Sequence, residues 1–270
     1  MGEHALTSHE RPRTIAALGS SFAAGPTIQP VDDAHAMRSA RNYPHLLAQT
    51  LGAALVDLTV SGATTANILS APQTTMTGRE FAPQIDGLPS DADLVTITAG
   101  GNDLQFIGSM LFAAWSKFAP GGPMARMLGE EFAGGIPSVA DHDIDSTATG
   151  LAAIVAAVRV RARQARVILV DYLTVVTEQT PTGGGEVFTD DELALFLRTQ
   201  EALGQAYRLA ADWSGAELLA VSRTSSDHGL GSEDPWVFGF RSVMATTAGS
   251  FHPNEAGMRA ITDELSRLVG

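Results

Sequence analysis

Short apolar segments that alternate with stretches of helical periodicity constrain the fold of this 270-residue chain more than any other feature. Short apolar runs bounded by turn residues are typical of buried strands, above all where β-branched side chains dominate. Parallel neighbours need crossover connections, which pack right-handedly on a sheet. The pattern therefore predicts an α/β protein with about five parallel strands and helices on both faces. The predicted strands are residues 14–18, 54–60, 94–98, 166–171 and 216–221, and the predicted helices are 43–51, 104–118, a short one within 119–137, 146–163, 190–213 and 254–268.

The first three predicted strands all end in glycine together with small polar residues. Gly19-Ser20-Ser21 follows the first strand, Ser61-Gly62-Ala63-Thr64-Thr65 the second, and Gly100-Gly101-Asn102-Asp103 the third. The carboxyl ends of the strands are where open α/β sheets bind their ligands. Taken alone, the first motif could be an ordinary strand-to-helix turn, but three such ends indicate a site at this edge of the sheet.

Charge and composition exclude several classes of partner and cofactor. With 17 basic and 30 acidic side chains the formal charge is −13, which argues against nucleic acid or an anionic membrane as the main partner. The absence of cysteine excludes disulfides, thiolate zinc sites and a cysteine nucleophile. The alternating acids of 141–145 resemble hard-metal ligands but lack the glycine and distal glutamate of a calcium loop. We interpret them as a solvated loop in which Asp145 or Ser146 caps the next helix, and we predict no metal and no cofactor.

The start of the chain and its hydropathy bear on domains and location. Residues 1–13 lack the apolar run of a signal peptide, and no stretch of about 18 apolar residues exists to span a bilayer. We therefore expect an N-terminal extension, 1–13, followed by a single domain, 14–270, without stable membrane insertion. The expected location is the cytoplasm, or outside the cell if a signal peptide has been removed.

Serine-based ester cleavage needs a base and donors directed at the developing oxyanion. The chain has Ser21 at its first strand end and His252 just before its last helix. The backbone N–H groups of Ser21 and Gly62 and the side-chain amide of Asn102 would provide three oxyanion donors. These residues predict a serine hydrolase. A flavodoxin-like anion-binding module is an alternative, but it gives Asn102 and His252 no role.

Four motifs follow one another along the chain: Gly19-x-Ser21, Ser61-Gly62-Ala63-Thr64-Thr65, Gly100-Gly101-Asn102-Asp103 and Phe251-His252-Pro253-Asn254-x-x-Gly257. In order and rough spacing they resemble the four blocks of the SGNH (GDSL) hydrolase superfamily, particularly its actinobacterial lipase and esterase branch. The resemblance extends from residue 14 to about 268 and implies a three-layer α/β/α, flavodoxin-like sandwich without a cofactor. It also implies that Ser21 is the nucleophile, that His252 is the base, and that Ser21, Gly62 and Asn102 form the oxyanion hole.

Two positions depart from the family pattern. Ser20 stands where the first block usually has an aspartate, and Gly249 stands where an acid commonly precedes the histidine by three residues. Without a carboxylate, the imidazole needs another acceptor for its second N–H. Some members of the branch use a main-chain carbonyl, so the resemblance predicts that the Gly249 carbonyl orients His252. Asp227 and Asp234 are the fallback acids.

The predicted function is hydrolysis of a small-molecule carboxylic ester through an acyl-enzyme, with short to medium acyl chains preferred. The substrate could be an acyl ester, a lipid or an acylated sugar. Two alternatives stay open: a catalytically weak or inactive ligand-binding protein of the same fold, and an acyltransferase that uses the same acyl-enzyme. The sequence indicates neither the physiological ester nor the oligomeric state.

Overall fold

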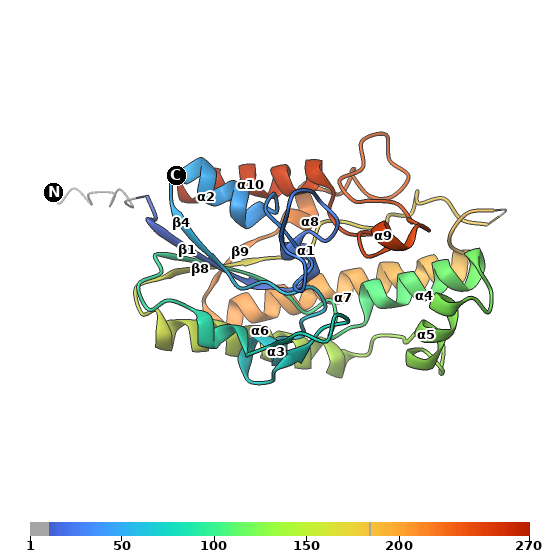
Figure 1. Cartoon of the computed structure of the whole chain (residues 1–270), viewed down its shortest axis with the longest axis horizontal. Helices are drawn as coiled ribbons and strands as arrows, with labels where there is room; N and C mark the ends of the chain where they lie inside the picture. The colour runs from blue at the N-terminus through green and yellow to red at the C-terminus, as the bar shows by residue number, and fades with distance from the viewer. Residues whose placement is uncertain (1–10, 184) are drawn as a thin grey trace.

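A five-stranded parallel sheet forms the middle layer of the protein (Figure 1). The computed structural model describes residues 11–183 and 185–270. The strand order is β4-β1-β7-β8-β9, and every neighbouring pair is parallel. The prediction of about five parallel strands is confirmed, although β4 and β9 are shorter than expected. The bounds are β1 (Thr14–Gly19), β4 (Ala54–Asp57), β7 (Leu94–Thr98), β8 (Arg166–Val170) and β9 (Glu217–Leu219).

Helices cover both faces of this sheet, which confirms the three-layer arrangement. In Figure 1, α2 and α10 lie above the sheet and pack on each other, while α6 and α7 pack together below it. The pair α4 and α5 extends beyond the sheet at the right of the same view. The bounds are α2 (Tyr43–Leu51), α4 (Phe106–Phe118), α5 (Pro123–Glu131), α6 (Asp141–Arg161), α7 (Asp190–Ser214) and α10 (Glu255–Val269).

Local signals explain where these helices begin and end. The Asn42 side chain accepts the N–H of His45 at 3.1 Å to cap α2, and Gly52 ends that helix with a left-handed φ of 69°. Asn254 caps α10 in the same way by accepting the N–H of Gly257 at 2.9 Å. Since Asn254 lies two residues after His252, this cap helps to set the position of the candidate base.

Strand β1 lies at the point where the sheet changes its direction of growth. The next strand in sequence, β4, is added on one side of β1, and β7 is added on the other. Loops that leave β1 and β7 therefore diverge, and such a switch point is where open α/β sheets form ligand crevices. Ser21 lies two residues after the end of β1 and occupies this point.

Several short elements were not predicted, because they are too short to show a hydrophobic period. Two small antiparallel hairpins, β2–β3 and β5–β6, lie in the segments that follow β1 and β4. These elements are β2 (Val31–Asp33), β3 (Arg38–Ser39), β5 (Gln73–Thr74), β6 (Glu80–Phe81), α1 (Ser21–Ala24), α3 (Thr65–Leu69), the 3₁₀ helix η1 (Gln84–Gly87), α8 (Val221–Thr224) and α9 (Met244–Thr247).

The interpretation of the acidic run as a solvated loop is wrong. Helix α6 starts at Asp141, and Asp143 accepts the backbone N–H of Ala140 at 2.9 Å. Acidic side chains favour the first turn of a helix because they compensate its unpaired N–H groups and its dipole. Within residues 11–183 and 185–270, no group of three or more histidine or acidic side chains is arranged to hold a metal ion.

The structure describes residues 11–13 of the predicted N-terminal extension and all of the predicted domain, 14–270, except residue 184. Residues 1–10 of the predicted extension lie outside the described residues, and β1 begins at Thr14. Among the helices that are described, none is both long enough and apolar enough to cross a membrane.

Candidate active site

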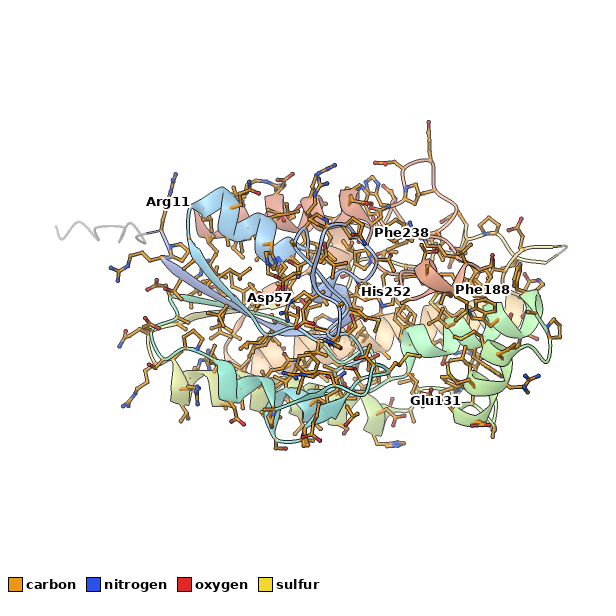
Figure 2. All side chains as sticks on the ribbon, in the orientation of Figure 1. Arg11, Asp57, Glu131, Phe188, Phe238 and His252 are labelled. Atoms are coloured by element: carbon orange, nitrogen blue, oxygen red, sulfur yellow. The ribbon has the colours of Figure 1, made fainter. Side chains whose placement is uncertain are left out.

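The two predicted reacting residues are in hydrogen-bond contact, although they are 231 residues apart in the chain. His252 Nε2 lies 2.8 Å from Ser21 Oγ. Ser21 is the first residue of α1, at the end of β1, and His252 lies on the loop that enters α10. Figure 2 places His252 in the middle of the molecule, beside the carboxyl end of the sheet. This is the geometry required for a base that removes a proton from a serine hydroxyl.

The second ring nitrogen of His252 contacts a main-chain carbonyl, but a different one from that predicted. Nδ1 lies 2.9 Å from the Ser250 carbonyl oxygen, whereas the Gly249 oxygen accepts the backbone N–H of His252 at 3.2 Å. The assignment of Gly249 is therefore wrong by one residue. The cause is the tight turn before His252, in which Phe251 has a left-handed φ of 64°.

Neither fallback acid replaces the missing carboxylate. The Asp234 carbonyl lies 2.7 Å from Nδ1 of His228, whose ring stacks on Trp236 at 3.8 Å. In the part of the chain that the structure describes, Asp227 makes no hydrogen bond or ion pair with His252. A serine–histidine pair with a carbonyl acceptor is what the fold forms here.

The space next to Gly249 explains why this position carries no acid. A Cβ built on Gly249 would lie 2.2 Å from Thr27 Oγ1 and 3.3 Å from the Pro26 carbonyl oxygen. Thr27 is held in place, since its hydroxyl oxygen accepts a hydrogen bond from Nη1 of Arg241 at 3.1 Å. The loop that follows Ser21 thus occupies the volume that a side chain at position 249 would need.

Gly249→Asp is accordingly expected to lower kcat by about tenfold rather than restore a triad, because Thr27 or the turn before His252 must move. Adding Thr27→Gly should recover activity, since a glycine removes the clash and suits the φ of 72° at that position. In the double variant the new carboxylate should also raise the pKa of His252 and shift the acid limb of the kcat/KM profile upward. Steady-state kinetics against pH on the single and double variants checks this. A single variant at or above wild-type activity would contradict it.

Burial keeps the imidazole neutral. His252 is 5% exposed, and burial lowers its pKa to about 4, an effect that the bond to the Ser250 carbonyl partly opposes. Because a carbonyl only accepts, Nδ1 carries the proton, and Nε2 is left as the acceptor for the Ser21 hydroxyl. His252 is therefore in the protonation state and tautomer of a general base.

The predicted oxyanion donors come from three neighbouring strand ends. Ser21 follows β1, Gly62 follows β4 and Asn102 follows β7, and these strands are adjacent. Within the described chain, the backbone N–H groups of Ser21 and Gly62 have no protein acceptor, and Gly62 is exposed with a φ of 85°. Asn102 Nδ2 donates one hydrogen bond to the Ala63 carbonyl at 2.8 Å, and the amide has a second N–H that can donate to an oxyanion.

Ser20 has a structural role in place of the usual aspartate. It is fully buried, and its Oγ lies 2.9 Å from Oη of Tyr172, which also accepts the N–H of Gly101 at 3.1 Å. The Tyr172 ring stacks on Phe22 with centroids 4.1 Å apart. Burial raises the pKa of Tyr172 to about 12, so its hydroxyl stays neutral. Ser20 thus links the ends of β1 and β7, and its hydroxyl contacts Tyr172 and not His252.

Sequence reasoning missed Tyr172 and a second buried residue, Gln84. The Gln84 amide pairs with both backbone groups of Gly19, at 2.8 Å to the N–H and 2.9 Å to the carbonyl. Asp103 accepts the N–H and hydroxyl of Thr65 and so fixes the start of α3. No local sequence pattern predicts these contacts, because each joins segments that are distant in the chain.

A parallel α/β fold with a serine–histidine pair at its switch point has the arrangement that nucleophilic cleavage of a carboxylic ester requires. The chain matches the model of the GDSL-like Lipase/Acylhydrolase family over residues 17–260 and belongs to that family. It is therefore a carboxylic ester hydrolase, and the resemblance to SGNH hydrolases is confirmed.

Relatives from Streptomyces agree with this assignment. Lipase 2 from Streptomyces coelicolor is 32% identical over 290 aligned positions, which cover 99% of this chain and 90% of that protein. An extracellular lipase from Streptomyces rimosus superposes with a TM-score of 0.72 at 21% identity, covering 95% of this chain and 99% of the other. A phospholipase A1 from Streptomyces albidoflavus gives a TM-score of 0.70 at 20% identity with the same coverage. These two structures share the fold.

Proposed function

We propose that the protein hydrolyses carboxylic esters through an acyl-enzyme formed on Ser21, with His252 as the general base and then the general acid. The observation that carries this proposal is the 2.8 Å contact between Ser21 Oγ and His252 Nε2, in a ring whose other nitrogen is held by the Ser250 carbonyl. Family membership gives the class of reaction, and this contact supports the residue roles.

In the proposed reaction, Ser21 Oγ attacks the acyl carbon while His252 Nε2 takes the hydroxyl proton. The tetrahedral oxyanion accepts hydrogen bonds from the N–H groups of Ser21 and Gly62 and from Asn102 Nδ2. The ester C–O bond then breaks, and His252 returns the proton to the leaving alcohol. Water, deprotonated by His252, then attacks the acyl carbon; the bond from that carbon to Ser21 Oγ breaks, His252 returns the proton to Ser21 Oγ, and the acid is released. This chemistry needs no cofactor.

The Ser250 carbonyl occupies the place that a carboxylate takes in a serine–histidine–aspartate triad. It orients the imidazole and selects the tautomer, as an aspartate would, but it carries no full charge to stabilise the imidazolium. We infer slower chemistry than in a related enzyme with an acid at this position. A low pKa of His252 keeps the base neutral, and therefore competent, in mildly acidic solution.

We propose an acyl chain of short to medium length. Phe251, which precedes His252, also lines a mainly apolar pocket of about 190 Å³ together with Phe188 and Phe240. The residues that line it include neither Ser21 nor His252. Since an apolar cavity of about 150 Å³ is large enough to hold benzene, we propose that a compact acyl group bound to Ser21 extends into this pocket. The name of the Streptomyces coelicolor relative, a lipase, supports a lipid ester as the natural substrate.

A panel of p-nitrophenyl esters from acetyl to palmitoyl, combined with a fluorophosphonate probe, tests the proposal. We expect the fastest hydrolysis for acetyl to butyryl esters and a single covalent adduct on Ser21, not on Ser20. Activity should persist to about pH 5, because the pKa of His252 is about 4. An unlabelled Ser21 with no ester hydrolysis would favour the inactive, ligand-binding alternative, and acyl transfer to an added alcohol in preference to water would favour the acyltransferase.

A further inference from the structure

A side-chain amide from the β5–β6 hairpin holds the peptide group that carries the Gly62 N–H. Gln73 Nε2 donates to the carbonyl oxygen of Ser61 at 2.8 Å. That carbonyl and the N–H of Gly62 belong to one planar trans peptide group, in which oxygen and hydrogen point in opposite directions. Whatever fixes the direction of the Ser61 oxygen therefore fixes the direction of the Gly62 N–H.

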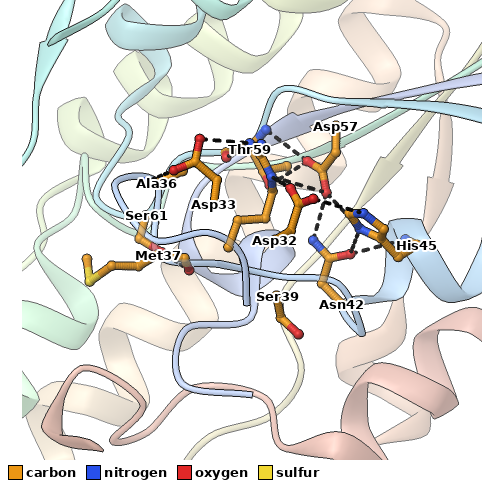
Figure 3. Close-up of polar contacts among 12 residues, drawn as sticks. Asp32, Asp33, Ala36, Met37, Ser39, Asn42, His45, Asp57, Thr59 and Ser61 are labelled. Carbon is orange, nitrogen blue, oxygen red and sulfur yellow. Dashed lines mark hydrogen bonds and ion pairs between the residues drawn. The ribbon is translucent and has the colours of Figure 1, made fainter. Parts of the chain in front are cut away.

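The neighbouring contacts anchor Ser61 but do not set the tilt of this peptide. Figure 3 shows Ser61 beside the β2–β3 hairpin, where its N–H donates to the Ala36 carbonyl at 2.9 Å and its hydroxyl to the Met37 carbonyl at 3.3 Å. Arg38 holds the Thr59 carbonyl, two residues earlier, at 2.8 Å. Across the described residues, the Ser61 carbonyl accepts a hydrogen bond from Gln73 alone.

Glycine at position 62 makes an external restraint on this peptide necessary. Gly62 adopts a φ of 85°, and a residue without Cβ can rotate its flanking peptide groups at little steric cost. Gln73 also packs closely here, since a Cβ on Gly62 would lie 3.3 Å from Gln73 Nε2. The backbone that precedes Gln73 is held by Asn67, whose Nδ2 donates to the Pro72 carbonyl at 3.1 Å.

We propose that Gln73 is a positioning residue for ester hydrolysis, which aligns and polarises the Gly62 N–H before the oxyanion forms. This inference rests on the proposed function, in which Gly62 is an oxyanion donor. A hydrogen bond to a peptide carbonyl strengthens the N–H of the same peptide as a donor. Donors that are already aligned stabilise the transition state without reorganisation. Gln73 does not touch the substrate and acts through the Ser61–Gly62 peptide.

The test compares Gln73→Glu, Gln73→Met and wild type with a p-nitrophenyl ester from pH 7.5 to 5. At pH 7.5 both variants should lose roughly tenfold or more in kcat with little change in KM, because neither can donate to the Ser61 carbonyl. A carboxylic acid can donate once protonated, so the kcat of Gln73→Glu relative to wild type should rise as the pH falls. Gln73→Met should show no such recovery. Gln205→Glu, the same substitution at an exposed position of α7, should keep wild-type kcat throughout.

Affinity for a boronic acid that forms a tetrahedral adduct on Ser21 provides a second measurement. Its inhibition constant should rise in parallel with the loss of kcat/KM in both Gln73 variants. Wild-type kcat in both variants, or equal recovery of both at low pH, would overturn the role of Gln73. Ester hydrolysis that survives in Ser21→Ala would instead overturn the proposed function, so the two failures are distinguishable.

Discussion

His252→Ala is expected to lower kcat by about 10⁴-fold or more, with KM close to that of wild type. Ser21 Oγ has His252 Nε2 as its hydrogen-bond partner, and neither Asp227 nor Asp234 is bonded to the pair. No other described side chain is therefore placed to take the proton. The rate of fluorophosphonate labelling at Ser21 should fall in the same proportion, because it depends on the same proton transfer.

The control for this prediction is His142→Ala, which removes a histidine whose side chain is 83% exposed on α6. It should keep wild-type kinetics. Because His252 is buried, thermal unfolding of His252→Ala must show that the variant is folded under assay conditions. A folded variant that retains more than a few per cent of wild-type kcat would contradict the role of His252 as the base.

Asn102→Ala should lower kcat by about 10²- to 10³-fold, the usual cost of removing one oxyanion-hole donor. The amide follows β7, beside the Ser21 turn, and among the described residues it donates to one acceptor, the Ala63 carbonyl. Asn102→Asp keeps the shape but places a carboxylate near the oxyanion, so we expect a loss at least as large. Substrate affinity should change little in either variant.

Steady-state kinetics and the inhibition constant of a boronic acid distinguish this role from a structural one. If Asn102 stabilises the oxyanion, the inhibition constant rises with the loss of kcat/KM. If Asn102 only ties β7 to the Gly62 turn through Ala63, its substitution changes KM and thermal stability. The inhibition constant of the boronic acid then changes together with KM and not with kcat. A kcat within threefold of wild type in Asn102→Ala would refute its role as a donor.

Much of the fold could be predicted from local pattern. The predicted helix 43–51 and strand 94–98 coincide with α2 and β7, because a capping asparagine, a terminal glycine and a β-branched run are local signals. The start of α6 was misplaced because its acidic first turn was interpreted as a loop. The short hairpins were missed because two or three residues show no period.

The residues of the candidate site could be predicted from the sequence, but not all of the contacts that hold them. Ser21, Gly62 and Asn102 could be grouped because parallel strands end at one edge, and His252 could be added because its motif resembles a family block. The carbonyl that contacts Nδ1 of His252 was assigned to Gly249 instead of Ser250, because no sequence pattern predicts the left-handed backbone turn at Phe251. The roles of Tyr172, Gln84 and Gln73 could not be predicted at all.

Periodicity, capping residues and the order of the motifs determine the α/β class and the candidate site residues, because these depend on neighbours along the chain. The packing of distant segments decides how those residues are held. Thr27 excludes an acid at position 249, the Ser250 carbonyl takes the place of that acid, and Gln73 fixes the peptide of Gly62. Each of these contacts joins atoms whose distance depends on backbone angles several residues away, and tertiary structure alone sets those angles.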